Sequence, residues 1–176
     1  MKRLFVSLCC LGIASTPVSA RRASAPVEMD EATKLLLASA MVAEGDWDSV
    51  VDHAAIAHVL ARRWRQAQSR HGWSFREMIQ RYCTAFDTRI QPNARQRWIR
   101  NLGWNGEEPI GWPASASWDP EKWKSVHETV EAFDRGELRD PCPGATHWTG
   151  RTDTPGVSWR RIRCSGPTAN GFWSGP

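Results

Sequence analysis

Apolar side chains recur at helical spacing between residues 30 and 136, bounded by helix start and stop signals, and this pattern restricts the chain to a mainly helical fold. The first predicted helix runs from about Asp30 to Glu44. Counting back from Glu44 in helical steps reaches four residues of a core-facing stripe: Met41, Ala40, Leu37 and Leu36. Glu44 continues this stripe, where acidic side chains are uncommon, and Gly45 ends the helix directly after it.

The position of Glu44 indicates a carboxyl group suited to acid catalysis. The backbone dipole is negative at the end of a helix, and partial burial also disfavours a charged group. We therefore expect Glu44 to keep its proton near neutral pH, at the floor of a sugar-sized groove, as a glycosidase acid does. The alternative is an acidic side chain at a frayed helix end that points into water.

A second helix is predicted to begin after Asp48 or Ser49, either of which can cap it. Its buried side is formed by four residues: Ile56, Val59, Leu60 and Trp64. Its end is expected at a basic cluster that suits the negative end of a helix: Arg62, Arg63 and Arg65. His53 and His58 are five residues apart, which does not place two metal ligands on one helical face. We expect both to be partly buried, with no metal bound.

Three further helices follow from capping signals. Ser74 and Glu77 form a capping box for a third helix that reaches about Tyr82, and Asn93 can cap a short fourth helix that Gly103 closes. The fourth helix contains Trp98 and Leu102.

The fifth helix is predicted from Asp119 as its cap and Pro120 at its first position, with Gly136 at its end. Its apolar stripe has four members: Trp123, Val126, Val130 and Phe133. After Asp140 the sequence becomes rich in Pro, Gly, Thr and Ser, and only residues 157–164 alternate enough to suggest a strand. The expected fold is mainly α with some β structure: about five helices and a short, largely irregular C-terminal segment.

Residues 1–20 have the features of a secretory signal peptide. Lys2 and Arg3 precede an apolar run at 4–14, and small residues at 18–20 form a cleavage site. The apolar run is shorter than the roughly 20 residues that span a bilayer, and no later stretch approaches that length. We therefore expect a secreted or periplasmic protein without a membrane span.

The mature chain is predicted to form one domain over residues 29–176, after a disordered lead at 21–28. Without the signal peptide 21 basic and 19 acidic side chains remain, a formal net charge of +2. This balance does not favour a nucleic-acid partner. We expect a monomer.

Three cysteines remain after removal of the signal peptide, which suits one disulfide and one free thiol in an exported protein. We pair Cys142 with Cys164 because they flank a segment with little helical pattern, whereas Cys83 falls at the end of a predicted helix. Cys83 is then a buried free thiol. A cysteine-dependent amidase or peptidase using Cys83 with His127 or His147 is a minor alternative.

Two short motifs resemble the cell-wall hydrolase family that includes the spore-cortex-lytic enzymes. Residues 40–45 read Ala-Met-Val-Ala-Glu-Gly, and 54–63 read Ala-Ala-Ile-Ala-His-Val-Leu-Ala-Arg-Arg. Residues 143–148, Pro-Gly-Ala-Thr-His-Trp, resemble the family's Gly-Ala-Thr-His-aromatic segment. More loosely, residues 78–86 occupy the place of the family's segment between these motifs.

The resemblance implies a lysozyme-like fold and a glycosidase that cleaves peptidoglycan, without a cofactor. It implies that Glu44 is the catalytic acid and that four residues bind substrate: Tyr82, Thr146, His147 and Trp148. The chain departs from the family where another acidic residue usually follows the catalytic one within an acid-Ala-Arg-Gly-acid pattern. Here the corresponding residues are as follows: Gly45, Asp46, Trp47 and Asp48.

The chemistry of glycosidic cleavage leaves two reactions open. A hydrolase needs a second carboxylate about 5 to 10 Å from the acid. The candidates nearest to Glu44 are these: Asp46, Asp48, Asp52 and Asp87. If none reaches the site, the C6 hydroxyl of the sugar attacks instead and leaves a 1,6-anhydro product, which is lytic transglycosylase chemistry.

A glycan-binding domain without catalysis is the alternative function. The chain has eleven Trp and one Tyr, and four Trp lie in Gly/Pro-rich segments where an indole can stack on a sugar: Trp104, Trp112, Trp118 and Trp148. The same residues could instead fill a loop-rich core.

Overall fold

The computed structural model describes residues 27–45, 49–83, 103–104, 109–110, 120–150 and 153–175. The described chain contains four helices: α1 (Glu31–Glu44), α2 (Val50–His71), α3 (Phe75–Tyr82) and α5 (Pro120–Asp134). It also contains an antiparallel three-stranded sheet in the order β3-β5-β4: β3 (His147–Gly150), β4 (Arg160–Arg161) and β5 (Asn170–Ser174). Two short strands pair separately: β1 (Gly103–Trp104) and β2 (Pro109–Ile110). The mainly helical prediction is confirmed.

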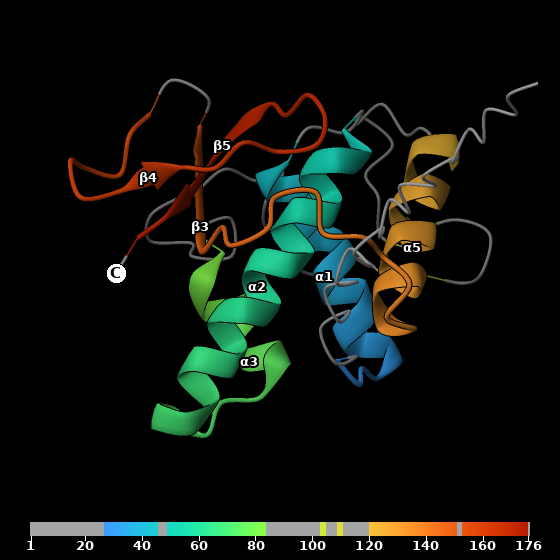
Figure 1. Cartoon of the computed structure of the whole chain (residues 1–176). Helices are drawn as coiled ribbons and strands as arrows, with labels where there is room; N and C mark the ends of the chain where they lie inside the picture. Colours follow the sequence, from blue (N-terminus) through green and yellow to red (C-terminus); the bar gives the residue numbers. More distant parts are fainter. Residues whose placement is uncertain are drawn as a thin grey trace, which may run out of the picture.

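Helix α1 lies within the helical body, which we define as α1, α2, α3 and α5. It packs against the other three helices, and its residues 37–42 are all buried (Figure 1). The helix begins near Asp30 as predicted, and Asp30 is its N-cap, because its Oδ1 accepts a hydrogen bond from the Thr33 backbone N–H at 2.7 Å. The predicted bounds of this helix are therefore confirmed.

Helix α2 begins as predicted and ends later than predicted. Ser49 is its N-cap and accepts from the Asp52 backbone N–H at 3.1 Å. The helix continues to His71 and ends at Gly72, whose φ of 66° suits a residue without Cβ. The expected end at the basic cluster of residues 62–65 is wrong. No glycine or proline interrupts the helix there, and two of those arginines bind another part of the chain.

Helices α3 and α5 match their predicted patterns. The capping box between Ser74 and Glu77 is present, with both reciprocal hydrogen bonds. The apolar stripe of α5 is buried, and Gly136 follows the helix with a φ of 72°. Most of the predicted fourth helix, including Asn93, lies outside the described residues, as does Asp119. Gly103 was expected to close that helix and instead pairs with Ile110 in the β1–β2 ladder.

The described parts of the C-terminal tail, residues 140–150 and 153–175, contain more strand than the sequence suggested. Of the predicted strand at 157–164, only Arg160–Arg161 forms β4. The two longer strands, β3 and β5, were not predicted, because neither carries a sustained polar and apolar alternation. They pair with Trp148 opposite Phe172, and the sheet lies at one end of the helical body (Figure 1).

The cysteines have the predicted states. Cys142 and Cys164 form a disulfide, and Cys83 is a buried free thiol. The expected disordered lead needs a correction at its end, because Val27 is only 2 % exposed and belongs to the hydrophobic core. Within the described segments, no helix combines the length and apolar character needed to cross a bilayer.

Candidate active site

Glu44 is the last residue of α1 and is partly buried. The following residue, Gly45, has a φ of −102°, which other residues also adopt, so its backbone conformation does not require glycine. Its packing does. A Cβ at Gly45 would lie 2.7 Å from the Met41 carbonyl oxygen and 3.3 Å from side-chain atoms of His53 and Ile56. The end of α1 is therefore pressed against α2, and this contact limits where Glu44 can lie.

Two residues of the sheet bind Glu44. The indole Nε1–H of Trp148, on β3, donates to Glu44 Oε2 at 3.2 Å. The side-chain amide of Asn170, at the start of β5, donates to the Glu44 carbonyl oxygen at 2.8 Å. The sheet thus holds both the carboxyl group and the backbone of Glu44. Trp148 is only 8 % exposed, so this hydrogen bond is largely shielded from water.

Asp52, a candidate second carboxylate, has a structural position. It lies in the first turn of α2 and is 0 % exposed. Its Oδ2 accepts from the Ala169 backbone N–H at 2.8 Å, and its Oδ1 from that of Asn170 at 3.5 Å. A carboxylate so buried anchors the start of β5 and does not face a substrate. The other three candidates lie outside the described residues: Asp46, Asp48 and Asp87.

Two consecutive arginines of α2 attach the tail to the helical body. Arg62 donates through Nε to the Ala145 carbonyl oxygen and forms an ion pair with Asp140. Arg63 donates through Nε to the Thr146 carbonyl oxygen at 2.6 Å. These bonds hold the segment before β3 against α2. Sequence reasoning missed this role, although an arginine pair inside an uninterrupted helical pattern is its visible signal.

Tyr82 joins the motif of residues 146–148 to α3. Its hydroxyl donates to the Thr146 carbonyl oxygen at 3.3 Å and is hydrogen-bonded to His147 Nδ1. Its ring packs edge-on against Trp148, with centroids 5.1 Å apart. The structure therefore brings together all five residues that the resemblance assigned to the site: Glu44, Tyr82, Thr146, His147 and Trp148.

The Tyr82 and His147 side chains are held in uncharged forms. Burial raises the pKa of the Tyr82 phenol, so this group remains a hydrogen-bond donor at neutral pH. Burial and then the positive charge of Arg63 lower the pKa of His147. A neutral imidazole with its hydrogen on Nδ1 satisfies the contact with the Tyr82 oxygen, while Tyr82 donates to Thr146.

Cys83 is unsuited to nucleophilic catalysis. It directly follows α3 and is 1 % exposed. Burial, with a smaller contribution from the charge of Glu44, raises the pKa of its thiol well above the ordinary value. A nucleophilic cysteine needs the opposite shift and access to substrate. The cysteine-dependent alternative is therefore disfavoured.

The tryptophans and histidines singled out by sequence have varied positions. Trp148 directs its N–H at Glu44, and its burial leaves little ring surface for sugar stacking. Trp112 and Trp118 lie outside the described residues. His53 and His58 are more deeply buried than predicted, and His58 Nε2 is 3.0 Å from the Leu138 carbonyl oxygen. Among the described residues, no three His, Cys, Asp or Glu side chains gather as a metal-binding group.

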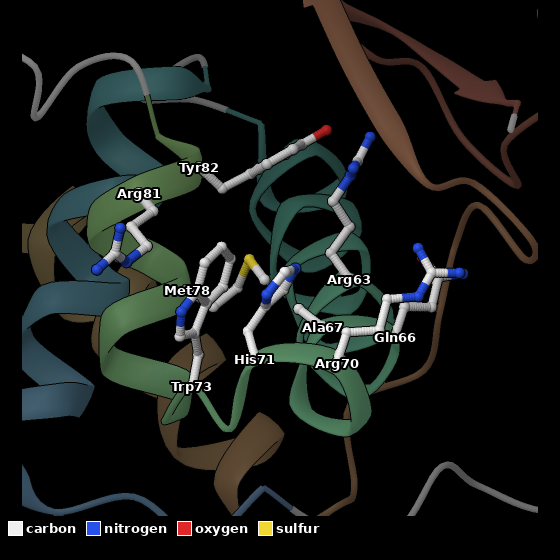
Figure 2. A pocket seen from close by; sticks show the side chains of 9 residues that line it. All are labelled: Arg63, Gln66, Ala67, Arg70, His71, Trp73, Met78, Arg81 and Tyr82. Carbon is white, nitrogen blue, oxygen red and sulfur yellow. The ribbon is translucent and has the colours of Figure 1, made fainter.

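A pocket of about 330 Å³ lies beside this site, between α2 and α3 (Figure 2). Tyr82 and Arg63 form part of its wall. Glu44 does not line it, so this pocket is not the groove that we expected over the carboxyl group. It is a neighbouring hollow that shares two side chains with the candidate active site.

Comparison of the chain with protein-family models, with curated proteins and with solved structures finds no match.

Proposed function

We propose that this protein is an exported, lysozyme-like glycosidase that cleaves peptidoglycan strands, with Glu44 as its general acid and base. The hydrogen bond from Trp148 to Glu44 is the observation that carries the proposal. It joins the glutamate of one family-like motif to the aromatic residue of the other, although the two are 104 residues apart in the sequence. Apolar packing between Trp148 and the end of α1 would not require the indole N–H to be directed at the carboxyl group of Glu44.

The proposed reaction begins with proton transfer from Glu44 to the glycosidic oxygen, so that the bond to the anomeric carbon breaks and the leaving sugar departs neutral. Trp148 stabilises the carboxylate that remains, because a charge-assisted hydrogen bond is stronger than a neutral one. Glu44 then acts as a base and takes the proton of the attacking hydroxyl group.

The attacking group decides between two products. Attack by the C6 hydroxyl of the same sugar gives a 1,6-anhydro end, whereas attack by water gives a reducing end. Asp52 is bound to the β5 backbone and does not assist water, which supports the anhydro route. Asp46, Asp48 and Asp87 are the remaining candidates for a hydrolytic second carboxylate.

The test is digestion of purified sacculi by the mature protein, with mass spectrometry of the released fragments. Glu44→Gln keeps a hydrogen-bond acceptor for Trp148 but cannot donate the proton, so we expect release to fall by about a thousandfold or more. The free energy of unfolding should change by less than about 1 kcal/mol. Glu31→Gln is the matched control, because Glu31 lies at the opposite end of α1 with a side chain 90 % exposed.

Undiminished release by Glu44→Gln would overturn the proposal. Binding of both proteins to sacculi without release of fragments would instead identify a glycan-binding domain, the alternative reading of the sequence. Anhydro ends, reducing ends and free peptides have different masses, so the same digest also identifies the reaction.

A further inference from the structure

The pocket beside the candidate active site is strongly basic. Among the described residues that line it, none is acidic, and three arginines and one histidine are present: Arg63, Arg70, Arg81 and His71. Figure 2 shows Arg63, Arg70 and His71 on the α2 side of the pocket and Arg81 on the α3 side, with the Arg81 guanidinium across Trp73 from His71. Its floor is apolar, since Ala67 and the buried Met78 also line it.

The aromatic rings of the pocket hold cations and are not open platforms. His71 stacks on Trp73 with ring centroids 4.5 Å apart, and the Arg81 guanidinium lies 4.8 Å from the Trp73 ring centroid. Figure 2 shows Trp73 between these two side chains. The guanidinium of Arg63 likewise lies 4.3 Å from the centroid of Tyr82. Because these faces are occupied, the pocket is unsuited to stacking a sugar, and the rings instead fix where positive charge lies.

The described acidic side chains form no ion pair with the arginines of the pocket, Arg63, Arg70 and Arg81. Glu77 lies one helical turn before Arg81, but its carboxylate accepts hydrogen bonds from Ser74 as part of the capping box. The pocket therefore offers several guanidinium donors to an anionic ligand, and guanidinium groups match carboxylates geometrically.

We propose that this pocket binds a carboxylate of the peptide stem carried by the muramic acid of the cleaved strand, an inference that rests on the proposed function. The stem branches from the sugar next to the scissile bond, and the pocket shares Tyr82 and Arg63 with the site around Glu44. Its volume of about 330 Å³ is at the small end of ligand pockets and suits a short acidic peptide. The pocket thereby selects strands that carry a peptide stem.

A binding measurement tests the pocket independently of catalysis. The probe is the free stem tripeptide L-Ala-γ-D-Glu-L-Lys, titrated by calorimetry, with the same peptide amidated at its carboxyl groups. We expect the Arg70→Gln/Arg81→Gln double variant to bind the acidic peptide at least about tenfold more weakly than the wild type, because two charge-assisted contacts are removed. The wild type should likewise bind the amidated peptide at least about tenfold more weakly than the acidic peptide.

Arg76→Gln is the matched control, since Arg76 is exposed on α3 and does not line the pocket. It should leave the affinity unchanged. Failure of the wild type to bind the acidic peptide, or equal binding by the double variant, overturns the inference. Arg70 and Arg81 are both exposed, so their replacement should not prevent folding, and thermal melting checks this point.

A cleavage measurement then separates the two proposals. On peptide-bearing strands the double variant should show a KM raised about tenfold with little change in kcat, and on peptide-stripped strands it should equal the wild type. Equal loss on both substrates overturns the role of the stem. If the wild type cleaves neither substrate, the proposed function fails while the peptide titration still decides what the pocket binds.

Discussion

The helical body and the C-terminal tail are held together by different kinds of interaction. In each helix of the body that has a described N-cap, the cap accepts from a backbone N–H three positions later, and α1 buries the continuous segment 37–42. The tail depends on bonds to distant residues. Asp52 binds Ala169 across 117 positions, and Glu44 binds Asn170 across 126. The disulfide adds a covalent bond within the tail.

This difference explains why the candidate active site lies where the two regions meet. The body supplies Glu44 from a buried helix, and the tail supplies the Trp148 and Asn170 groups that orient it. A rigid element can hold a catalytic group, while hydrogen bonds from a second element select its orientation. If the comparison is right, changes in the body should lower global stability, and changes in the tail should first affect the site.

The largest expected effect is in the centre of the body. Leu37 is 0 % exposed, and Leu37→Ala should lower the free energy of unfolding by about 4 kcal/mol, through lost burial and a cavity. Urea denaturation measures this value. Leu36→Ala is the control, because it removes the same side-chain atoms at a partly exposed position of the same helix. Equal losses for the two variants would contradict the deeper burial of Leu37.

A smaller and more local effect is expected from removal of the disulfide. Cys142→Ser with Cys164→Ser frees a segment of 22 residues, and loop entropy predicts a loss of about 3 kcal/mol. Hydrogen exchange should show β3 and β5 losing protection before α1 and α2 do. A reducing agent should destabilise the wild type and leave the double variant unaffected. Simultaneous loss of protection in the helices would argue against separate behaviour of the tail.

The contact between body and tail is tested by two tryptophans of the same sheet. Trp148→Phe removes the indole N–H that binds Glu44, and we expect kcat on sacculi to fall about tenfold with a stability loss of about 1 kcal/mol. Trp173→Phe is a closely matched control, because Trp173 is equally 8 % exposed but donates to Thr149 at 2.9 Å. It should lose similar stability and keep its activity. Equal kcat values for both variants would contradict a role of Trp148 in catalysis.

The smallest effect is a pH dependence at the segment between α5 and the tail. Burial lowers the pKa of His58, which joins α2 to the Leu138 carbonyl. The unfolded chain protonates this histidine near its ordinary pKa of about 6.5, whereas the folded protein does so only at lower pH. Stability should therefore fall as the pH decreases from 7.5 to 5.5, and less so in His58→Gln. Urea midpoints at several pH values measure this dependence. An equal decrease in the wild type and in His58→Gln would show that His58 does not cause it.

The helices could be predicted because their signals are local. Asp30, Ser49 and the Ser74–Glu77 pair each act on a backbone group within three residues, so the sequence contains cause and effect side by side. The disulfide followed from the number and placement of cysteines. The end of α2 was predicted wrongly because Arg62 and Arg63 were interpreted as a local helix-end signal, whereas their partners are 83 positions away.

The sequence by itself determined the helical body, the cysteine pairing and the identity of the candidate site residues, because short-range caps, apolar periodicity and motif residues are visible along the chain. Only the tertiary structure decided that Trp148 binds the carboxyl group, that Asp52 anchors β5, and that a basic pocket adjoins Tyr82. The first two features depend on contacts across 104 and 117 positions, and the pocket depends on the packing of α2 against α3. Such pairs form only when the helices and the sheet have packed together.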